Sequence, residues 1–151
     1  KQFADAVVTG GRGGQEMKTI PYFVNGNSLL SVSSVGVVTN HGTIPGSGRV
    51  SMATNGQYLV IVIPGSNAYV FNNQDNTITQ VTDSDFIPSD TVVFKDGYFV
   101  FSASDGTVFF HSELNDPFTY NALDFGTAEI NNALICALIL DVFSSCSMRF
   151  M

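Results

Sequence analysis

Residues 91–110 read TVVFKDGYFVFSASDGTVFF, three apolar runs separated by two Asp-Gly pairs. The runs are rich in Val, Phe and Tyr, which favour β-strands. Asn or Asp followed by Gly, as at Asn55-Gly56 and Asp96-Gly97, accepts the positive φ angles of a type I′ turn, whose twist matches that of the flanking strands. Asp105-Gly106 marks a second turn. The stretch therefore predicts three antiparallel strands joined by short turns.

The same arrangement occurs twice more toward the N-terminus. The turn glycines Gly26, Gly65 and Gly106 are 39 and 41 residues apart, and Asn55-Gly56 precedes Asp96-Gly97 by 41 residues. A period of about 40 residues is typical of a four-stranded blade of a β-propeller. The first copy has its turn at Asn25-Gly26 and only a weak inner strand.

We therefore predict an all-β fold with about three four-stranded antiparallel blades. Residues 1–129 form the partial propeller, with blades at approximately 10–45, 46–87 and 88–129. The expected inner strands are 15–18, 49–53 and 91–94; the long strands that follow are 20–24, 58–63 and 98–102; the third strands are 27–32, 67–71 and 107–110; the outer strands are 37–39, 77–81 and 120–125. A propeller ring holds about four to eight blades. Three blades do not close a ring, so we expect a piece of a longer protein or assembly with other chains.

Composition and charge argue against a nucleic-acid partner and against insertion into a membrane. The chain of 151 residues carries 13 acidic and 6 basic residues, a formal net charge of −7, and has no Lys/Arg cluster of the kind that binds nucleic acid. Its longest apolar run, residues 133–140, is too short to cross a bilayer as a helix. The N-terminus lacks the pattern of a signal peptide. No nucleic-acid or membrane partner is predicted.

Two glycine-rich stretches invite comparison with phosphate-binding loops. In Gly10-Gly11-Arg12-Gly13-Gly14, the third glycine of a dinucleotide fingerprint is replaced by Glu16, and neither stretch has the Lys-Ser/Thr of a Walker loop. We interpret the first stretch as a flexible loop. Gly46-Ser47-Gly48-Arg49 is interpreted as a tight loop before an inner strand, with Arg49 as its anchor. No cofactor is predicted.

No catalytic or metal site is predicted either. His41 and His111 lie in different copies of the repeat, and Ser112 beside His111 points to the opposite face of its strand. Residues 83–90 begin like a calcium loop but lack its central Gly and its last Glu. No spacing among the carboxylates Asp105, Glu113, Asp116 and Asp124 selects a glycosidase pair. We interpret the two cysteines, Cys136 and Cys146, as free thiols.

Several longer motifs resemble one protein family. They are GSGRVSMA at 46–53, VVFKDGYFVF at 92–101, LNDP at 114–117 and YNALDFGTAE at 120–129. The chain from about Phe3 to Glu129 resembles the packaged-DNA stabilisation proteins of short-tailed bacteriophages, also called head-completion or tail accessory factors.

The resemblance implies a non-enzymatic structural protein of the virion tail, made in the cytoplasm of the bacterial host. Members of the family attach beneath the portal after packaging, extend the tail and help to retain the DNA. The implied partners are portal or adaptor proteins, the tail needle protein and further copies of the chain. Alternatives are a carbohydrate-binding or glycosidase-like propeller and a general propeller scaffold.

The family pattern departs after Glu129. The segment 130–151 contains no glycine, and we expect it to be truncated or frameshifted. The candidate site residues are therefore structural turn positions only: Asn25, Gly26, Gly46, Gly48, Arg49, Asn55, Gly56, Gly65, Asp96, Gly97, Asp105 and Gly106.

Overall fold

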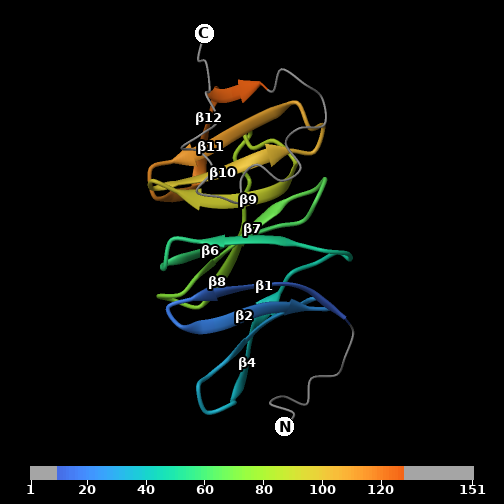
Figure 1. Ribbon diagram of the computed structural model, residues 1–151, viewed down its shortest axis with the longest axis vertical. Helices are drawn as coiled ribbons and strands as arrows, with labels where there is room; N and C mark the ends of the chain where they lie inside the picture. The colour runs from blue at the N-terminus through green and yellow to red at the C-terminus, as the bar shows by residue number, and fades with distance from the viewer. Residues whose placement is uncertain (1–9, 128–151) are drawn as a thin grey trace, which may run out of the picture.

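A computed structural model describes residues 10–127, which form twelve β-strands in three antiparallel sheets (Figure 1). The first sheet contains β1 (Gly11–Met17), β2 (Ile20–Asn25), β3 (Ser28–Val32) and β4 (Val38–Thr43). The second contains β5 (Ser51–Thr54), β6 (Tyr58–Val62), β7 (Ala68–Asn72) and β8 (Thr77–Gln80). The third contains β9 (Ser89–Lys95), β10 (Tyr98–Ala103), β11 (Val108–Glu113) and β12 (Asp116–Thr127).

Each sheet is a meander in which consecutive strands are neighbours. The inner strands lie beside one another, β1 against β5 and β5 against β9, and the outer strand β4 lies near β8. The sheets are stacked face to face along the long axis of the molecule (Figure 1). These are propeller blades, here named blades 1, 2 and 3, and the predicted all-β fold is confirmed.

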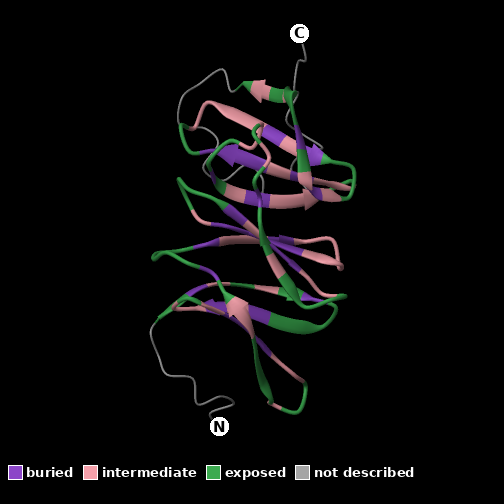
Figure 2. Cartoon of the chain, turned by 180° about the vertical axis from the view of Figure 1, so that it is seen from behind, coloured by how far each residue is buried: buried purple, intermediate pink, exposed green. Residues whose placement is uncertain are grey.

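The core consists of two clusters, one in each space between blades. Strand β6 serves both, because its successive side chains point to opposite faces. Leu59 and Ile61 pack toward blade 1, while Val60 and Val62 pack toward blade 3. All four are fully buried, which explains why this strand is continuously apolar. Figure 2 shows the buried residues concentrated on the strands and the exposed ones at the turns and outer strands.

The cluster between blades 2 and 3 contains a group of aromatic rings on its blade 3 side. Phe101 stacks on Phe110 with ring centroids 5.1 Å apart, and the ring of Phe86 lies edge-on to both. Tyr120 from the outer strand completes the group. Aromatic pairs of this geometry contribute beyond the area they bury, so Phe86 fastens the connector to blade 3.

A type I′ turn is predicted at the two Asx-Gly pairs that join a first strand to a second strand, and it forms at one of them. Asp96 and Gly97 have φ angles of 51° and 91°, as a type I′ turn requires. At Asn55-Gly56 the prediction of that turn type is wrong, because only Gly56 has a positive φ. Asn55 instead accepts hydrogen bonds from the amides of Gln57 and Tyr58 through Oδ1, which stabilises a longer loop.

Two strands of blade 1 depart from the expected boundaries. Its inner strand covers residues 11–17 rather than 15–18, and its outer strand covers 38–43 rather than 37–39. The interpretation of Gly10–Gly14 as a flexible loop is therefore wrong, since four of these residues lie in β1. The expected departure at 130–151, including Cys136 and Cys146, lies outside the described residues. Among the described residues no helix is long and apolar enough to cross a membrane.

Candidate functional site

Each blade presents its turns on two rims. Because neighbouring strands are antiparallel, the turn between the first and second strands and the turn between the third and fourth lie together on what we call the hairpin rim. The other turn and the connectors between blades form the connector rim. Of the predicted turn residues, Asn55, Gly56, Asp96 and Gly97 lie on the hairpin rim; Asn25, Gly26, Gly46, Gly48, Arg49, Gly65, Asp105 and Gly106 lie on the connector rim.

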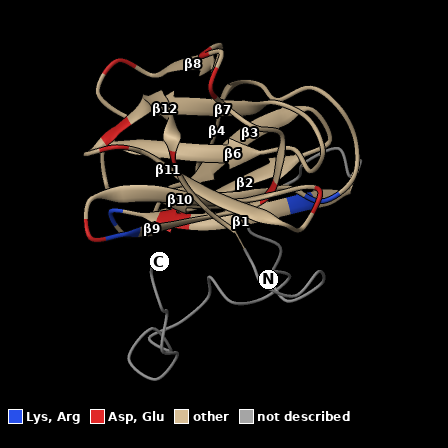
Figure 3. Ribbon diagram, turned by 90° about the horizontal axis from the view of Figure 1, so that it is seen from above, with Lys and Arg blue, Asp and Glu red and all other residues tan. Residues whose placement is uncertain are grey.

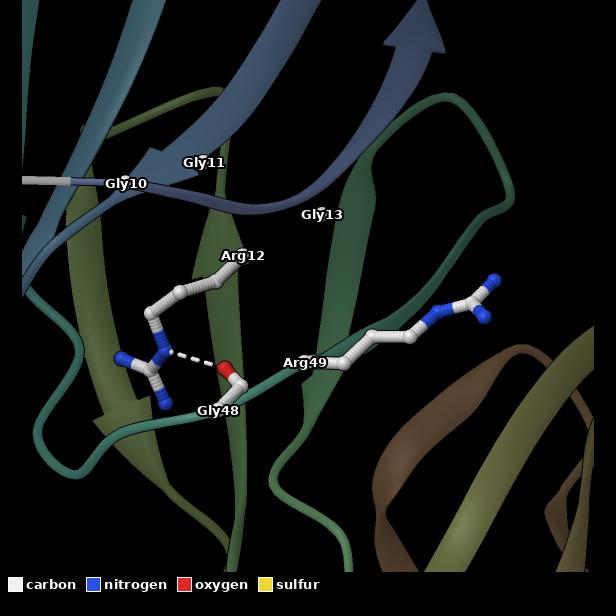
Figure 4. A pocket seen from close by; sticks show the side chains of 6 residues that line it. All are labelled: Gly10, Gly11, Arg12, Gly13, Gly48 and Arg49. Carbon is white, nitrogen blue, oxygen red and sulfur yellow. Dashed lines mark hydrogen bonds between the residues drawn. The ribbon is translucent and has the colours of Figure 1, made fainter.

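Arg12 holds the connector rim of blade 1 together. Its side chain is only 7% exposed. Nε donates to the carbonyl oxygen of Gly48 at 2.8 Å (Figure 4). Nη1 donates to the carbonyl oxygens of Gly26 at 3.1 Å and Ile44 at 3.0 Å. Both terminal nitrogens also lie 3.2 Å from the carbonyl oxygen of Pro45. One guanidinium therefore ties the turn of blade 1 to the connector that leads into blade 2.

Carbonyl dipoles surround the Arg12 charge. Burial lowers the pKa of this guanidinium. Between residues 10 and 127 the only ion pair joins Lys95 to Asp96, at 3.9 Å on the surface. Figure 3 shows the charged residues as separate segments on a largely uncharged ribbon. The predicted anchor Arg49 is exposed and extends away from the loop, so Arg12 has the role expected of Arg49 (Figure 4).

A shallow pocket of about 550 Å³ lies here, lined by Gly10, Gly11, Arg12, Gly13, Gly48 and Arg49. Of its four glycines, only Gly13 is required by close packing. A Cβ on Gly13 would lie 2.8 Å from the carbonyl oxygen of Val50, where β1 approaches the start of blade 2. The amide of Val50 donates to the carbonyl oxygen of Arg12 at 2.9 Å. Gly13 thus allows β1 to meet the start of blade 2, and the Arg12 guanidinium already donates to backbone carbonyl oxygens.

Acidic residues near blade 3 also bind backbone groups. Asp83 and Asp85, in the connector between blades 2 and 3, accept hydrogen bonds from the amides of Tyr120 and Ala122, both at 3.2 Å. They hold the connector against β12. Burial, with the nearby carboxylates of Asp116 and Asp83, raises the pKa of the Tyr120 hydroxyl, which donates to the carbonyl oxygen of Pro117.

The carboxylates considered for glycoside cleavage are used locally. Asp105 accepts from the amide of Thr107 at 2.9 Å, a bond that lowers the pKa of this carboxyl. Asp116 accepts from the amide of Phe118 and the hydroxyl of Thr119. No three His, Cys, Asp or Glu residues in the described part of the chain are grouped to hold a metal ion.

The two histidines have different surroundings. His111 contacts the carbonyl oxygen of Ser112 through Nδ1, while the hydroxyl of Ser112 donates to the carbonyl oxygen of Glu113, so the two side chains do not pair. A contact that the sequence did not indicate joins His41 Nε2 to Ser31 Oγ at 2.8 Å across β3 and β4. Only the cross-strand pairing of the two strands brings these residues together.

The His41 ring also packs between blades. Its centroid lies 4.8 Å from that of Phe71 in blade 2 and 5.4 Å from that of Tyr22. Burial lowers the pKa of His41, and a hydrogen bond with Asn76 partly opposes the shift. Ser31 is only 7% exposed, so the hydrogen bond lies inside blade 1, and the His41 ring makes the contact with blade 2.

Exposed apolar side chains form two patches. The blade 1 patch lies on the hairpin rim, where Val35 is 83% exposed, Val37 58%, and Ile20 and Val38 37% each. The blade 3 patch contains Leu114 at 58%, Leu123 at 82% and Phe125 at 52%. Clustered exposed apolar residues mark interaction surfaces more often than scattered ones do. These patches are the features best suited to contact another protein.

Comparison with solved structures supports the fold. The chain superposes with a TM-score of 0.54 on PorZ, a bacterial surface component of the type-IX secretion system of Porphyromonas gingivalis, at 13% identity over 76% of this chain and 16% of that one. The Pan2 WD40 domain of Neurospora crassa gives the same TM-score at 10% identity over 74% and 34%. A chain of a mitotic checkpoint complex gives 0.54 at 9% identity over 84% and 45%. The chain thus spans less than half of each, and the likeness concerns the fold alone.

No curated protein matches the sequence. A protein-family profile described as "Bacteriophage P22 Gp10, beta-propeller" matches residues 1–140. The match extends past Glu129, where the motif resemblance ended, and it confirms the resemblance to phage packaged-DNA stabilisation proteins. With its blades and this match over nearly the whole sequence, the chain belongs to that family of phage structural β-propeller proteins.

Proposed function

We propose that the chain acts at the junction between portal and tail of a phage particle, where it completes the head, extends the tail and helps to retain the packaged DNA. It is made in the cytoplasm of the bacterial host and takes its place in the virion tail. Its partners are portal or adaptor proteins, the tail needle protein and other copies of itself. The family match over residues 1–140 is the observation that carries the proposal.

The described residues suit a non-enzymatic role of this kind. Their buried polar groups serve the fold: Arg12 binds backbone carbonyl oxygens, and Ser31 binds His41 within blade 1. The apolar patches lie on the surface, where a partner protein can cover them. With a net charge of −7, the chain would retain DNA by closing the channel through protein contacts rather than by binding phosphates.

Deletion of the gene from its phage tests the proposal. We expect heads to package DNA and then lose it, which electron microscopy would show as empty heads and DNase treatment as degraded genome. Supplying the intact gene in trans should restore DNA-filled particles, and antibody labelling should mark the portal-tail vertex of these particles. Particles that stay full and infectious without the gene would contradict the proposal.

A further inference from the structure

The pocket beside β1 is lined by two cations and by no carboxylate. Arg12 and Arg49 supply its charged side chains, and its other lining residues are glycines. Within residues 10–127 neither guanidinium forms an ion pair. A cleft lined by one sign of charge raises the local concentration of counter-ions, so this pocket attracts an anion.

The charges around the pocket differ in sign from those of the whole chain. Residues 10–74 contain three basic residues and one acidic residue, a net charge of +2, and Arg49 is the only charged residue between 19 and 74. Residues 75–127 contain nine acidic residues and one lysine, a net charge of −8. The acidic residues of the described chain are thus concentrated away from the pocket in sequence, and its two cations keep their field.

The connector that borders the pocket has amide donors to offer. None of the amides of residues 46–49 donates to a backbone carbonyl oxygen of the described residues. Gly46 and Gly48 have φ angles of 86° and 78°, whereas Ser47 and Arg49 lie outside the left-handed region. Alternation between the two backbone regions turns successive amides toward one side, which makes a concave site for an anion.

Three of the four glycines in the pocket leave room for a ligand to approach the backbone. A Cβ added at Gly10, Gly11 or Gly48 would have no atom within 4 Å. Positive φ angles explain the residue type at Gly10 and Gly48, but Gly11 has neither a positive φ nor a close neighbour. The role left for Gly11 is to keep this wall of the pocket free of a side chain.

We propose that the pocket between β1 and the connector to blade 2 binds an inorganic phosphate ion. The Arg49 guanidinium and the amides of residues 47–49 donate to its oxygens, and the buried charge of Arg12 adds to the attraction. Donors on several sides of a pocket suit a tetrahedral anion, whereas a planar carboxylate has only two oxygens. A free ion is favoured over DNA, because the net charge of −7 repels a polyanion.

Binding requires one movement and joins two segments. The side chains of Arg12 and Arg49 extend in different directions (Figure 4), so the exposed Arg49 has to turn toward the ion. Exposed side chains change rotamer rapidly, so this movement is fast. The bound ion would then connect β1 to the connector and stabilise the start of blade 2 against blade 1.

An NMR titration of the 151-residue chain with inorganic phosphate, at an ionic strength held constant with chloride, tests the site. We expect saturable shifts confined to the amides of residues 10–13 and 46–50. R49Q should weaken binding about tenfold or more, the effect of losing a hydrogen bond to a charged group. G11A should also weaken it, because the new methyl group would stand in the pocket. K18Q removes an exposed cation at the β1–β2 turn, on the other rim, and is the matched control that should bind like the wild type.

Urea denaturation gives a second measurement. Phosphate should raise the urea midpoint of the wild type and of K18Q more than that of R49Q, since only chains with the site gain the binding free energy. The general stabilisation of folded proteins by phosphate is common to all three chains and cancels in the comparison. R49K, which keeps the charge without the planar fork, should recover part of the difference.

Shifts that do not saturate or that spread over the whole surface would overturn the inference, as would R49Q binding phosphate as tightly as the wild type. Acetate bound as tightly as phosphate would overturn the assignment to a tetrahedral anion. A short DNA duplex that displaces phosphate at an equal phosphate concentration would overturn the assignment to a free ion. The measurements use purified chain alone, so a negative result would leave the proposed function at the portal-tail junction standing.

Discussion

At the scale of single residues, Arg12 has the largest structural role in the connector rim. Its guanidinium donates to four carbonyl oxygens, of Gly26, Ile44, Pro45 and Gly48, that belong to the β2–β3 turn of blade 1 and to the connector into blade 2. Its five donors are spread over a planar fork and can reach four separate acceptors, whereas the three donors of a Lys ammonium all lie on one nitrogen. Arg49, only a few residues along the chain, is exposed and offers a natural control.

R12M should lower the free energy of unfolding by about 2–4 kcal/mol, because it leaves carbonyl oxygens without donors in a partly buried site. R12K should recover only part of the loss. Urea denaturation followed by circular dichroism would measure both. R49M should remain within about 0.5 kcal/mol of the wild type. An equally small effect of R12M would show that the Arg12 hydrogen bonds do not stabilise the protein.

His41 predicts a dependence of stability on pH. Because the folded protein holds the pKa of His41 below its ordinary value of 6.5, the unfolded chain binds the proton more readily. The contribution of neutral His41 to the free energy of unfolding is therefore complete above pH 6.5. It is lost as the pH falls from there through the pKa of His41 in the folded protein. The urea midpoint should decrease between pH 7.5 and 5.5, and H41Q, which does not titrate, should reduce that decrease. A profile unchanged by H41Q would refute the assignment.

At the scale of elements, the hairpins between first and second strands show how one turn is made in different ways. Blade 3 uses Asp96-Gly97, whereas blade 1 places Lys18 and Thr19 at φ angles of 51° and 67°. A β-branched residue is rarely found in this left-handed region, because its side chain collides with the backbone. The β1–β2 hairpin therefore forms against its local preference, and packing of the flanking strands maintains it.

T19G should stabilise the protein by about 1 kcal/mol, since the strain removed at Thr19 exceeds the extra flexibility of Gly in the unfolded chain. G97A, the reverse change at the matching turn position of blade 3, should destabilise it by about 1–2 kcal/mol, since Gly97 has a φ of 91°. In thermal unfolding, the melting temperature should be highest for T19G, intermediate for the wild type and lowest for G97A. A lower melting temperature for T19G would mean that Thr19 makes a contact worth more than the strain.

At the scale of the whole molecule, stability depends on how closely blades approach one another. The middle blade is covered on both faces, with Leu59 and Ile61 against blade 1 and Val60 and Val62 against blade 3. Near the connector rim the backbones themselves meet, where Gly13 of β1 lies against Val50. Fixed backbone atoms cannot rotate away from an added methyl group, so this is the least tolerant point between blades 1 and 2.

G13A should therefore destabilise the protein by about 2–3 kcal/mol, because the new Cβ would lie 2.8 Å from the carbonyl oxygen of Val50 and force the blades apart. G11A is the matched control in the same strand, since a Cβ there has no atom within 4 Å. Denaturant unfolding should separate the two variants clearly. Equal effects of G11A and G13A would point to the loss of glycine itself rather than to the approach of the blades.

Local features of the sequence predicted the architecture. The period of about 40 residues, the strand-forming runs and Asp96-Gly97 each reflect neighbours along the chain, so spacing and propensity were sufficient to indicate three four-stranded blades. The family resemblance was likewise recognised from residue order alone, in the motifs at 92–101 and 120–129. The prediction for Gly10–Gly14 was wrong because glycine composition alone does not distinguish a flexible loop from a strand that a neighbouring blade approaches closely.

The sequence by itself thus determined the repeat, the β-fold and the family, since these depend on residue type and order. Only the tertiary structure decided that Arg12 rather than Arg49 anchors the connector, that His41 bonds to Ser31, and which apolar residues are exposed. Arg12 and Gly48 are 36 residues apart, and a contact at that distance exists only once two blades are stacked. Burial in a propeller also depends on the neighbouring blade, because alternation along a strand identifies two faces without showing which of them is covered.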